Sequence, residues 1–453
     1  MTECNQESFG FAPYFSRAVV ARFDGGTMTS DGGGLLLRQV ERRIRLLERL
    51  AGCFDDRRQP QRVRHALEEM LAQRVYALAL GYEDLNDHEE LRRDPLLAVL
   101  SGKRKAGEQE LAGKSTLNRL ELGGEEPGRY KRIRFRQEAL DALLVDVFLE
   151  AHEAPPESIV LDLDATDLPL HGHQEGRFFH GFYDEYCYLP LYVFCGEHLL
   201  LARLRTAGQD AAAGAMAEVE GLVAQIRARW PQVAIVVRAD SGFCRDELLH
   251  WCEQHSVGYV VGCARNPLLR RRIETAMQEA ARLQEQTGAA ARVFCEFPHR
   301  TESGSWSCER RVVAKAEQIE GKENPRFVVT NLSGGAWPAQ ELYEQLYCAR
   351  GEMENRIKEQ MSLFATRVSA ATLRANQLRV SLAGCAYVLL HALRRLGLQA
   401  TALAHAQATT IRLQLLKIGA RVRLTARKVW LSLASSFPRQ ALFRQVWLRL
   451  TTG

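Results

Sequence analysis

The first part of the chain alternates apolar and polar positions with the period of a helix. After a glycine-rich stretch, FDGGTMTSDGGGLLL, apolar residues recur every three to four positions in residues 35–40 and 65–72. This spacing is typical of amphipathic helices that turn one face to a core. We therefore expect residues 1–150 to form a mostly helical region.

From residue 155 the pattern changes to short apolar runs separated by turn residues. Strands are expected at residues 158–165, 188–195 and 198–205, and the Gly196-Glu197 pair predicts a tight hairpin between the last two. A helix, a strand, a helix and a strand are then expected at residues 211–230, 233–240, 244–255 and 258–263. This order predicts an α/β protein with a ribonuclease H-like core.

Alternating apolar and polar positions return between residues 290 and 335. Two stretches, 292–297 and 305–314, predict a small β-rich insertion, and a third, 327–332, predicts the closing strand of the core. Helical spacing resumes at residue 338. The expected regions are residues 1–150 (N-terminal and helical), 155–285 (first part of the core), 286–325 (β-rich insertion), 326–375 (closing strand and following helix of the core) and 376–453 (C-terminal, helical and basic).

Acidic residues lie in or directly after two of the predicted strands. Asp162 and Asp164 alternate within an apolar run, so they share one face of their strand. Asp240 ends a run of buried type and precedes the turn residues Ser241 and Gly242. Carboxylates are rarely buried unless they are paired or hold a metal, and open α/β sheets place their sites at the carboxyl ends of strands. The alternative for Asp240 is a cap on the helix expected from residue 244.

A third acid lies in a later segment with helical spacing. Tyr347, Arg350, Glu354 and Lys358 follow one another at steps of three, four and four, so a helix would align them on one face. A solvated ladder of ion pairs has the same spacing and is the alternative. The company of two strand-borne aspartates favours a site.

Three carboxylates that share a site repel one another, and a divalent cation removes that repulsion. Oxygen ligands favour Mg²⁺ or Mn²⁺, and two such ions roughly 3.5–4 Å apart can activate a water or a 3′ hydroxyl for attack on a phosphodiester. We therefore expect two ions bound by Asp162 or Asp164 together with Asp240 and Glu354. Arg350 and Lys358 would then contact phosphates, and Tyr347 would lie near the scissile link.

The charge of the chain is unevenly distributed. The net charge is +5, but residues 361–453 contain 14 lysines and arginines and no acidic residue. A segment without counter-charge is typical of a surface that binds a polyanion, and a solvated amphipathic face is the alternative. We expect this basic end to contact nucleic acid.

The cysteines and the N-terminus bear on localisation. The 11 cysteines include no C-x-x-C pair, and the N-terminus lacks the apolar segment of a secretory signal. Reduced thiols fit this pattern better than disulfides or a zinc finger. The longest late apolar run, residues 380–390, is shorter than the ~20 residues that a membrane span requires. We expect a cytoplasmic protein without a membrane partner.

Residues 111–121, LAGKSTLNRLE, follow a loop and carry short polar residues where a helix would begin. Two interpretations remain open for this segment. It is either a plain helix cap or the reading helix of a helix-turn-helix that presents Ser115, Thr116, Asn118 and Arg119 to DNA.

Several long motifs resemble a known family. The stretches LDLDATDLPLHGHQEGRFFHGFYDEYCYLPLYVFCG, VVRADSGF and YCARGEMENRIKE, with STLNRLE before them and ATLRANQLR after them, are similar to bacterial DDE transposases of the insertion sequence 1380 family. The resemblance runs through most of the chain in order. It implies a ribonuclease H-like core with a β-rich insertion and metal-dependent transposition at terminal inverted repeats.

Carried over by position, the resemblance implies a catalytic and metal-binding triad of Asp164, Asp240 and Glu354. Asp162 remains a rival for the first position. The related signature of Tyr, Arg, Glu and Lys matches Tyr347, Arg350 and Glu354, but its lysine falls on Met361. Lys358, one turn from Glu354, is the candidate substitute for the phosphate contact.

The histidines His171, His173 and His180 suggest a metal site, but no cysteine or further histidine is suitably spaced. The preferred expectation is that they flank the substrate groove together with Gln174, Glu175 and Arg177.

The sequence therefore predicts a DDE transposase that cleaves DNA at the element's ends and transfers the strand into target DNA. Its expected partners are double-stranded DNA, both the terminal inverted repeats and the target, and a second copy in a homodimer. The N-terminal and C-terminal regions would bind the ends. The alternative is a DNA-binding repressor or a domesticated derivative with an inactive ribonuclease H-like core.

Overall fold

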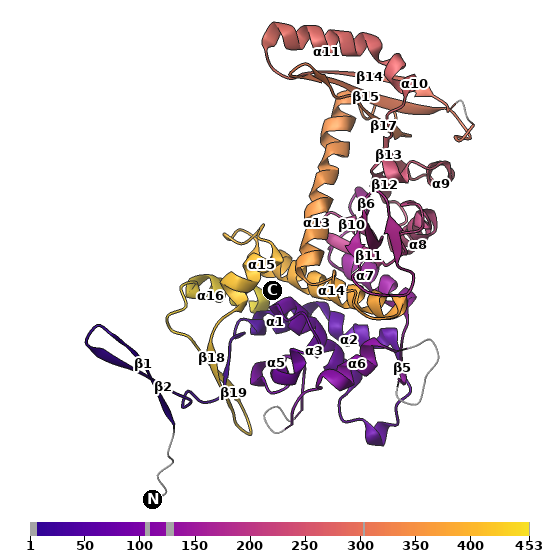
Figure 1. Ribbon diagram of the computed structural model, residues 1–453. Coiled ribbons are helices and arrows are strands. Elements are labelled where there is room, and N and C mark those ends of the chain that lie inside the picture. Colours follow the sequence, from indigo (N-terminus) through magenta and orange to yellow (C-terminus); the bar gives the residue numbers. More distant parts are fainter. Residues whose placement is uncertain (1–6, 105–108, 124–130, 302–303, 453) are drawn as a thin grey trace, which may run out of the picture. The chain divides into compact units, whose positions relative to one another are not determined.

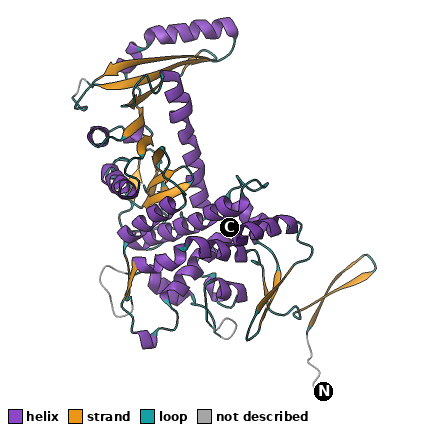
Figure 2. Cartoon of the chain, turned by 180° about the vertical axis from the view of Figure 1, so that it is seen from behind, coloured by secondary structure: helices purple, strands orange, loops and turns teal. Residues whose placement is uncertain are grey.

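The computed structural model describes residues 7–104, 109–123, 131–301 and 304–452. The chain divides into two compact units. We call residues 137–361 and 365–381 the sheet unit, and residues 1–136, 362–364 and 382–453 the helical unit. The first unit contains the large sheet with helices beside it, and the second unit is mainly helical (Figures 1 and 2).

The sheet unit is built on a nine-stranded mixed sheet with the order β11-β10-β6-β12-β13-β17-β15-β14, in which β16 pairs with β15. Strands β6, β12 and β13 are parallel, and every other pairing is antiparallel. The strand bounds are β6 Ser158–Ala165, β10 Leu191–Cys195, β11 His198–Arg203, β12 Ala234–Ala239, β13 Gly258–Cys263, β14 Ala291–His299, β15 Arg310–Ile319, β16 Lys322–Glu323 and β17 Arg326–Thr330.

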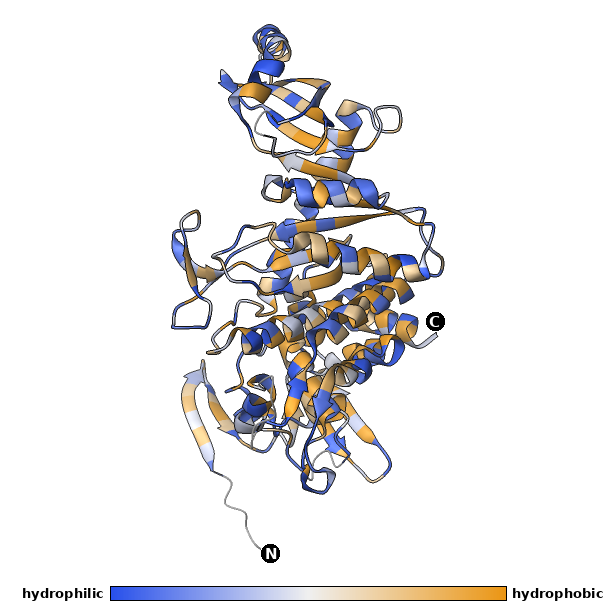
Figure 3. Cartoon of the chain, turned by 90° about the vertical axis from the view of Figure 1, so that its right-hand side faces the viewer, coloured by the Kyte–Doolittle hydropathy of each residue, from blue (hydrophilic) through white to orange (hydrophobic). Residues whose placement is uncertain are grey.

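Helices cover both faces of this sheet. Leu222 and Ile226 of one helix pack with Leu161 and Val237 on one face, and Leu346 packs with Val260 on the other. In Figure 3 the strands carry long hydrophobic stretches, while the helices beside them mix hydrophobic and hydrophilic residues. The helices of this unit are α7 Gln137–Glu150, α8 Ala215–Arg229, α9 Asp246–Gln254, α10 Pro267–Arg272, α11 Glu274–Thr287 and α14 Leu373–Leu393, the last of which continues into the helical unit.

Four consecutive helical segments join into one rod, visible in orange in Figure 1. The rod comprises α12 Ala339–Glu341, η4 Leu342–Tyr347, η5 Cys348–Arg350 and α13 Gly351–Ser362. Its apolar residues Leu342, Tyr343 and Leu346 are buried in the core on one sheet face. The helix expected around Tyr347 and Glu354 is therefore present. Within it, η4 has the wider turns of a π-helix and η5 the tighter turns of a 3₁₀-helix.

The strand expected at residues 188–195 is wrong as one element. Pro190 has no N–H to donate and interrupts it. The first part is β9, Glu185–Tyr188, which joins β7, Leu168–Pro169, and β8, Phe178–His180, in a small separate sheet. The second part is β10 of the large sheet. Strands β14 and β15, expected as a β-rich insertion, extend the large sheet through β17.

The helical unit packs short helices against the two ends of the chain. Its helices are α1 Gly34–Ile44, α2 Leu46–Leu50, α3 Leu67–Leu80, α4 His88–Leu91, α5 Pro95–Leu100, α6 Lys114–Glu121, α15 Ala408–Ile411 and α16 Gln440–Thr452. Its shorter helical turns are η1 Ala51–Cys53, η2 Pro60–Arg62, η6 Arg394–Leu398 and η7 Arg412–Leu416. Its strands are β1 Ser8–Tyr14, β2 Arg17–Arg22, β3 Met28–Thr29, β4 Phe54–Asp56, β5 Ile133–Phe135, β18 Ala420–Leu424 and β19 Val429–Leu433.

The C-terminal region was expected to be helical throughout, and this expectation is wrong. Strands β18 and β19 form a hairpin, and β18 pairs with β3 near the start of the chain. The glycine-rich stretch makes this pairing possible. Gly33 donates its N–H to the Leu416 carbonyl, and a Cβ there would lie 2.2 Å from the Leu415 carbonyl oxygen. Within the described residues, no helix has the length and hydropathy that crossing a bilayer requires.

Candidate active site

The first two acids lie at neighbouring strand ends. Strand β6 runs parallel to β12 with Leu163 opposite Ala239, so Asp164 and Asp240 follow at the same edge of the sheet. Asp240 Oδ1 accepts the N–H of Gly242 at 2.8 Å and caps the short turn η3, Ser241–Phe243. It does not cap α9, whose first residue is Asp246. Asp240 therefore caps the turn η3 and not the helix α9. Its second oxygen, Oδ2, takes no part in this cap.

Glu354 joins this edge through an arginine of the rod. Arg350 Nη1 donates to Asp164 Oδ2 at 3.0 Å, and Arg350 Nη2 lies 3.4 Å from Glu354 Oε1. The Glu354 side chain is 53% exposed, whereas that of Asp164 is 14% exposed. One guanidinium thus links a buried strand acid to an accessible helix acid.

The acids influence one another electrostatically. The pKa of Asp164 is raised to about 6, mainly by burial; the charge of Arg350 lowers it, and the nearby charges of Asp240 and Glu354 raise it. Burial also raises the pKa of Tyr347, with Arg350 lowering it and Asp240 raising it. These residues of the two strands and the rod therefore lie close enough to affect one another's pKa. Among them, only Arg350 carries a positive charge that offsets the acids.

Asp162 has a different environment, although it shares its strand face with Asp164. Arg238 binds both oxygens of Asp162, with Nε to Oδ1 at 2.5 Å and Nη2 to Oδ2 at 2.7 Å. The third nitrogen, Nη1, donates to the Leu346 carbonyl of the rod at 2.5 Å. Both residues of this ion pair are buried. The Asp162–Arg238 pair therefore anchors the rod to the sheet, whereas Asp164 contacts Arg350 of the rod.

Gly262 is a site residue that sequence reasoning missed. It lies in β13, and a Cβ at this position would be 2.6 Å from Tyr347 Oη and 2.8 Å from the Ser241 N. Any side chain would push the rod or the Asp240 turn away from the sheet. The available signal was a glycine near the end of an otherwise apolar strand, which often marks a close approach of another segment.

The predicted groove residues hold the chain together near the start of α14. Glu175 Oε2 accepts the N–H of Leu373 at 2.9 Å, and Gln174 Nε2 donates to the Val368 carbonyl at 3.3 Å. Arg177 lies over the Tyr186 ring at 4.6 Å. In the described part of the chain, no group of three or more His, Cys, Asp and Glu residues, including those around His171, His173 and His180, is arranged to hold a metal ion. A role for these residues in flanking a groove stays a prediction.

Lys358 and Met361 occupy different environments on the rod. Lys358 is exposed, one turn after Glu354, whereas Met361 is half-buried. A phosphate contact is therefore sterically open to Lys358, and it stays a prediction.

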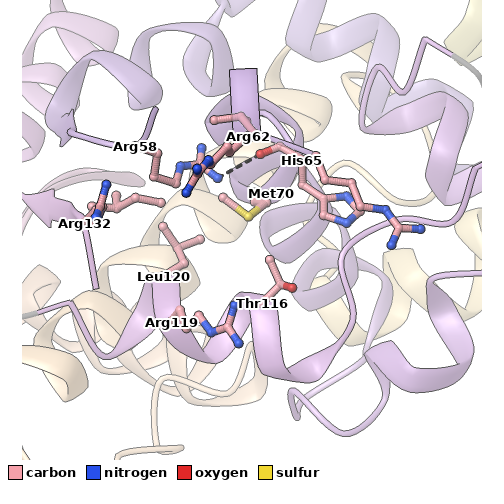
Figure 4. Close-up of a pocket in the computed structure, with 11 residues that line it drawn as sticks. Arg58, Arg62, His65, Met70, Thr116, Arg119, Leu120 and Arg132 are labelled. Atoms are coloured by element: carbon pink, nitrogen blue, oxygen red, sulfur yellow. Dashed lines mark hydrogen bonds between the residues drawn. The ribbon is translucent and has the colours of Figure 1, made fainter. Parts of the chain in front are cut away.

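The second predicted DNA-binding set lies on α6. Ser115 and Arg119 are exposed and Asn118 is half-buried. Thr116 and Arg119 line a cavity, together with arginines from residues 58–64 and 132 that sequence reasoning did not single out (Figure 4). Those arginines lie in loops around two very short elements, where hydropathy patterns carry no signal.

The comparisons with known proteins give the family. A family model described as Transposase DDE domain group 1 matches residues 11–452. The match covers nearly the whole chain, which therefore belongs to this family of transposases. Its function is transposition, the family implies nuclease and transferase activity, and DDE transposases generally use divalent metal ions.

No match was found among curated proteins. Among solved structures, the chain is similar to the cryo-EM structure of a piggyBac transposase synaptic complex with hairpin DNA. The sequence identity is 10%, the TM-score is 0.42, and the similarity covers 85% of this chain and 79% of that chain.

Proposed function

We propose that the sheet unit is a ribonuclease H-like core in which Asp164, Asp240 and Glu354 are the catalytic acids. The strand order β11-β10-β6-β12-β13, with α8 and α9 in the connections, supports this core. The observation that carries the assignment is the shared edge of Asp164 and Asp240, linked to Glu354 through Arg350.

The donor set fits hard divalent cations. The three residues offer carboxylate oxygens only, which Mg²⁺ and Mn²⁺ prefer. Two such ions, when bound, would activate the attacking water or 3′ hydroxyl and stabilise the leaving oxygen. Burial makes an ionised Asp164 unfavourable without a cation beside it, and Arg350 supplies that charge here. If metal ions took over this role, the Arg350 guanidinium could contact a phosphate instead.

The remaining residues of the rod suit DNA contacts. Tyr347 lies beside the Asp240 turn, and Lys358 is exposed one turn beyond Glu354. Guanidinium and ammonium groups bind phosphate oxygens and fix the position of the strand without reading its sequence. We assign Tyr347, Arg350 and Lys358 to the strand near the scissile phosphate, and Ser115, Asn118 and Arg119 of the helical unit to the element's end.

The motif resemblance supports a finer placement in the bacterial insertion sequence 1380 family. On this placement the substrates are double-stranded DNA with terminal inverted repeats and a target duplex, and the acting species is a homodimer. Short inverted repeats flanking the coding region, bracketed by a small target duplication, would support the placement.

The test is single-turnover cleavage of a labelled duplex that carries the element's own end, with Mg²⁺. Asp240→Asn keeps the acceptor for the Gly242 N–H and removes the charge, and we expect it to slow cleavage about 100-fold or more, the scale of losing a key electrostatic group. The matched control is Glu341→Gln, which removes one exposed charge from the start of the rod and should cleave at the wild-type rate. Equal rates for Asp240→Asn and wild type would sink the catalytic assignment.

The rival, a DNA-binding protein with an inactive core, has one observation in its favour. Arg350 occupies oxygens of both Asp164 and Glu354, so the acids are not gathered as a ready ligand set. If the protein only binds DNA, the wild-type protein and the variants should all bind the end duplex, and none of them should cleave it with Mg²⁺ or with Mn²⁺.

A further inference from the structure

A cavity of about 320 Å³ opens within the helical unit, and none of the residues assigned to catalysis lines it. It lies between the loop that follows β4, the helix α6 and the strand β5 (Figure 4). Arginines are the most frequent residue in its wall. The five are Arg58, Arg62, Arg64, Arg119 and Arg132.

The wall contains no acidic residue. Arg58 binds both oxygens of Asp56 and also donates to the His65 carbonyl at 2.9 Å. Within the described chain, Arg62 and Arg119 form no ion pair. The pKa of Glu110 is lowered mainly by its hydrogen bond from Arg93, and the charge of Arg64 adds a smaller effect. Several like charges therefore face one space with little compensation, and such an arrangement is stable only when an anion occupies it or water screens it.

The arginines approach from different segments. In Figure 4, Arg58 and Arg62 lie on one side of the cavity and Arg119 with Thr116 on the other, with Met70 and Leu120 beside them. Guanidinium forks suit phosphate oxygens because each can donate two parallel hydrogen bonds. The Thr116 hydroxyl adds a neutral donor of the kind that commonly contacts DNA phosphates.

We propose that this cavity is a phosphate-binding site for the backbone of duplex DNA, in which Arg62 and Arg119 hold phosphates at the element's end. The proposal rests on the proposed transposase reaction for its choice of ligand. Arg62, Arg64 and Arg119 are exposed at the rim, where a duplex can reach them, whereas a closed pocket would suit a small free anion. The site fixes position and affinity and reads no bases, because backbone contacts carry no sequence information.

The test measures DNA affinity as a function of salt. The full-length chain is titrated into a short fluorescent duplex carrying the element's end at about 50–200 mM salt, where each phosphate contact contributes a slope near −0.9 in log affinity against log salt. The double variant Arg62→Gln with Arg119→Gln should reduce the magnitude of the slope by about 2. A scrambled duplex should lose affinity by the same factor.

Two controls separate charge from folding. Arg42→Gln removes an exposed helical arginine of the same unit that does not line the cavity, and it should leave the slope unchanged. Arg62→Lys with Arg119→Lys keeps the charge and should retain most of the slope while weakening binding, because lysine lacks the guanidinium fork. If the double glutamine variant unfolds, the single variant Arg119→Gln on the exposed face of α6 should still reduce the slope by about 1.

The outcomes distinguish this proposal from the reaction it rests on. A wild-type slope in the folded glutamine variants overturns the cavity assignment, even if end cleavage is intact. Thermal protection of the wild-type protein by inorganic phosphate together with an unchanged DNA slope also overturns it, in favour of a small-anion site. A wild-type protein that binds and cleaves no end DNA contradicts the proposed function instead.

Discussion

Asp162 and Asp164 show how two identical residues on one strand face acquire different roles. Asp162 is clamped by Arg238, which lies 76 residues away in sequence. Asp164 meets Arg350, which lies 186 residues away. The alternation that places both acids on one face was predictable from the sequence. Which of them is engaged in a buried ion pair was not, because neither partner can be identified from local spacing.

Stability and cleavage should therefore respond differently to the two aspartates. Asp162→Ala leaves the buried Arg238 without its partner, and we expect it to lower the free energy of unfolding by about 3–5 kcal/mol. Asp164→Asn should preserve or raise stability at pH 8, because burial and neighbouring acids already raise the pKa of this carboxyl to about 6. It should abolish cleavage. Urea unfolding and end cleavage measure the two effects.

The opposite outcome would assign the first catalytic position to Asp162. In that outcome the Asp162→Ala protein is folded and stable but does not cleave, and the Asp164→Asn protein still cleaves.

At the scale of elements, the sequence predicted the strands at 158–165 and 258–263 with their observed bounds, because each is a short apolar run between turn residues. It misplaced the boundary at Pro190 because the apolar run continues through the proline. It also missed the β18–β19 hairpin, since that hairpin is held by a glycine-lined contact with the opposite end of the chain. A contact between backbone segments that are far apart in the chain produces no periodic pattern in the sequence of either segment.

The junction of α1 and α2 should make stability depend on pH. Glu41 Oε1 accepts the N–H groups of Leu47 and Glu48, while Oε2 is buried without a partner. Burial raises the pKa of Glu41 to about 7, with the backbone hydrogen bonds opposing it. The folded pKa lies above the unfolded value, so the neutral carboxyl favours folding, and this stabilisation is present below about pH 4.5 and lost as pH rises through 7.

Urea unfolding of the wild-type protein at pH 5 and pH 8 should show this effect. The free energy of unfolding should be lower at pH 8, and Glu41 should account for up to about 3 kcal/mol of the difference. Glu41→Gln should remove that part of the change, because an amide keeps the acceptor and cannot ionise. Glu68→Gln, an exposed acid of α3, is the control and should behave as wild type. An identical pH dependence in the Glu41→Gln protein would contradict a buried neutral carboxyl.

At the scale of the whole molecule, the basic residues of the acid-free C-terminal region lie in two kinds of environment. Some of its basic residues are used internally. Arg412 donates to the Ala79 carbonyl at 3.1 Å, and Lys417 pairs with Asp31 at 2.6 Å. A backbone carbonyl accepts a hydrogen bond from Arg412, and an acid from the N-terminal part of the chain supplies the counter-charge for Lys417. The composition of the C-terminal region alone could not reveal these partners.

Other basic residues of this region remain exposed on the β18–β19 hairpin. Arg423 and Lys428 lie 5.9 and 5.3 Å from the centre of the exposed Trp430 ring, and Arg427 lies at the turn. We expect glutamine at all three basic positions to flatten the salt dependence of DNA binding by up to about 3 in slope. Truncation after residue 400 should instead unfold the helical unit, because it removes α16 and β18. An unchanged slope in the folded triple variant would show that this surface is only solvated.

We propose that Asp164, Asp240 and Glu354 bind the metal ions of the reaction. This can be measured by replacing Mg²⁺ with Fe²⁺ and mapping where iron-generated radicals cut the polypeptide. We expect cuts close to residues 164, 240 and 354 that excess Mg²⁺ suppresses and that disappear in Asp164→Asn but persist in Glu341→Gln. Cuts confined to other segments, or cuts unaffected by Asp164→Asn, would contradict it.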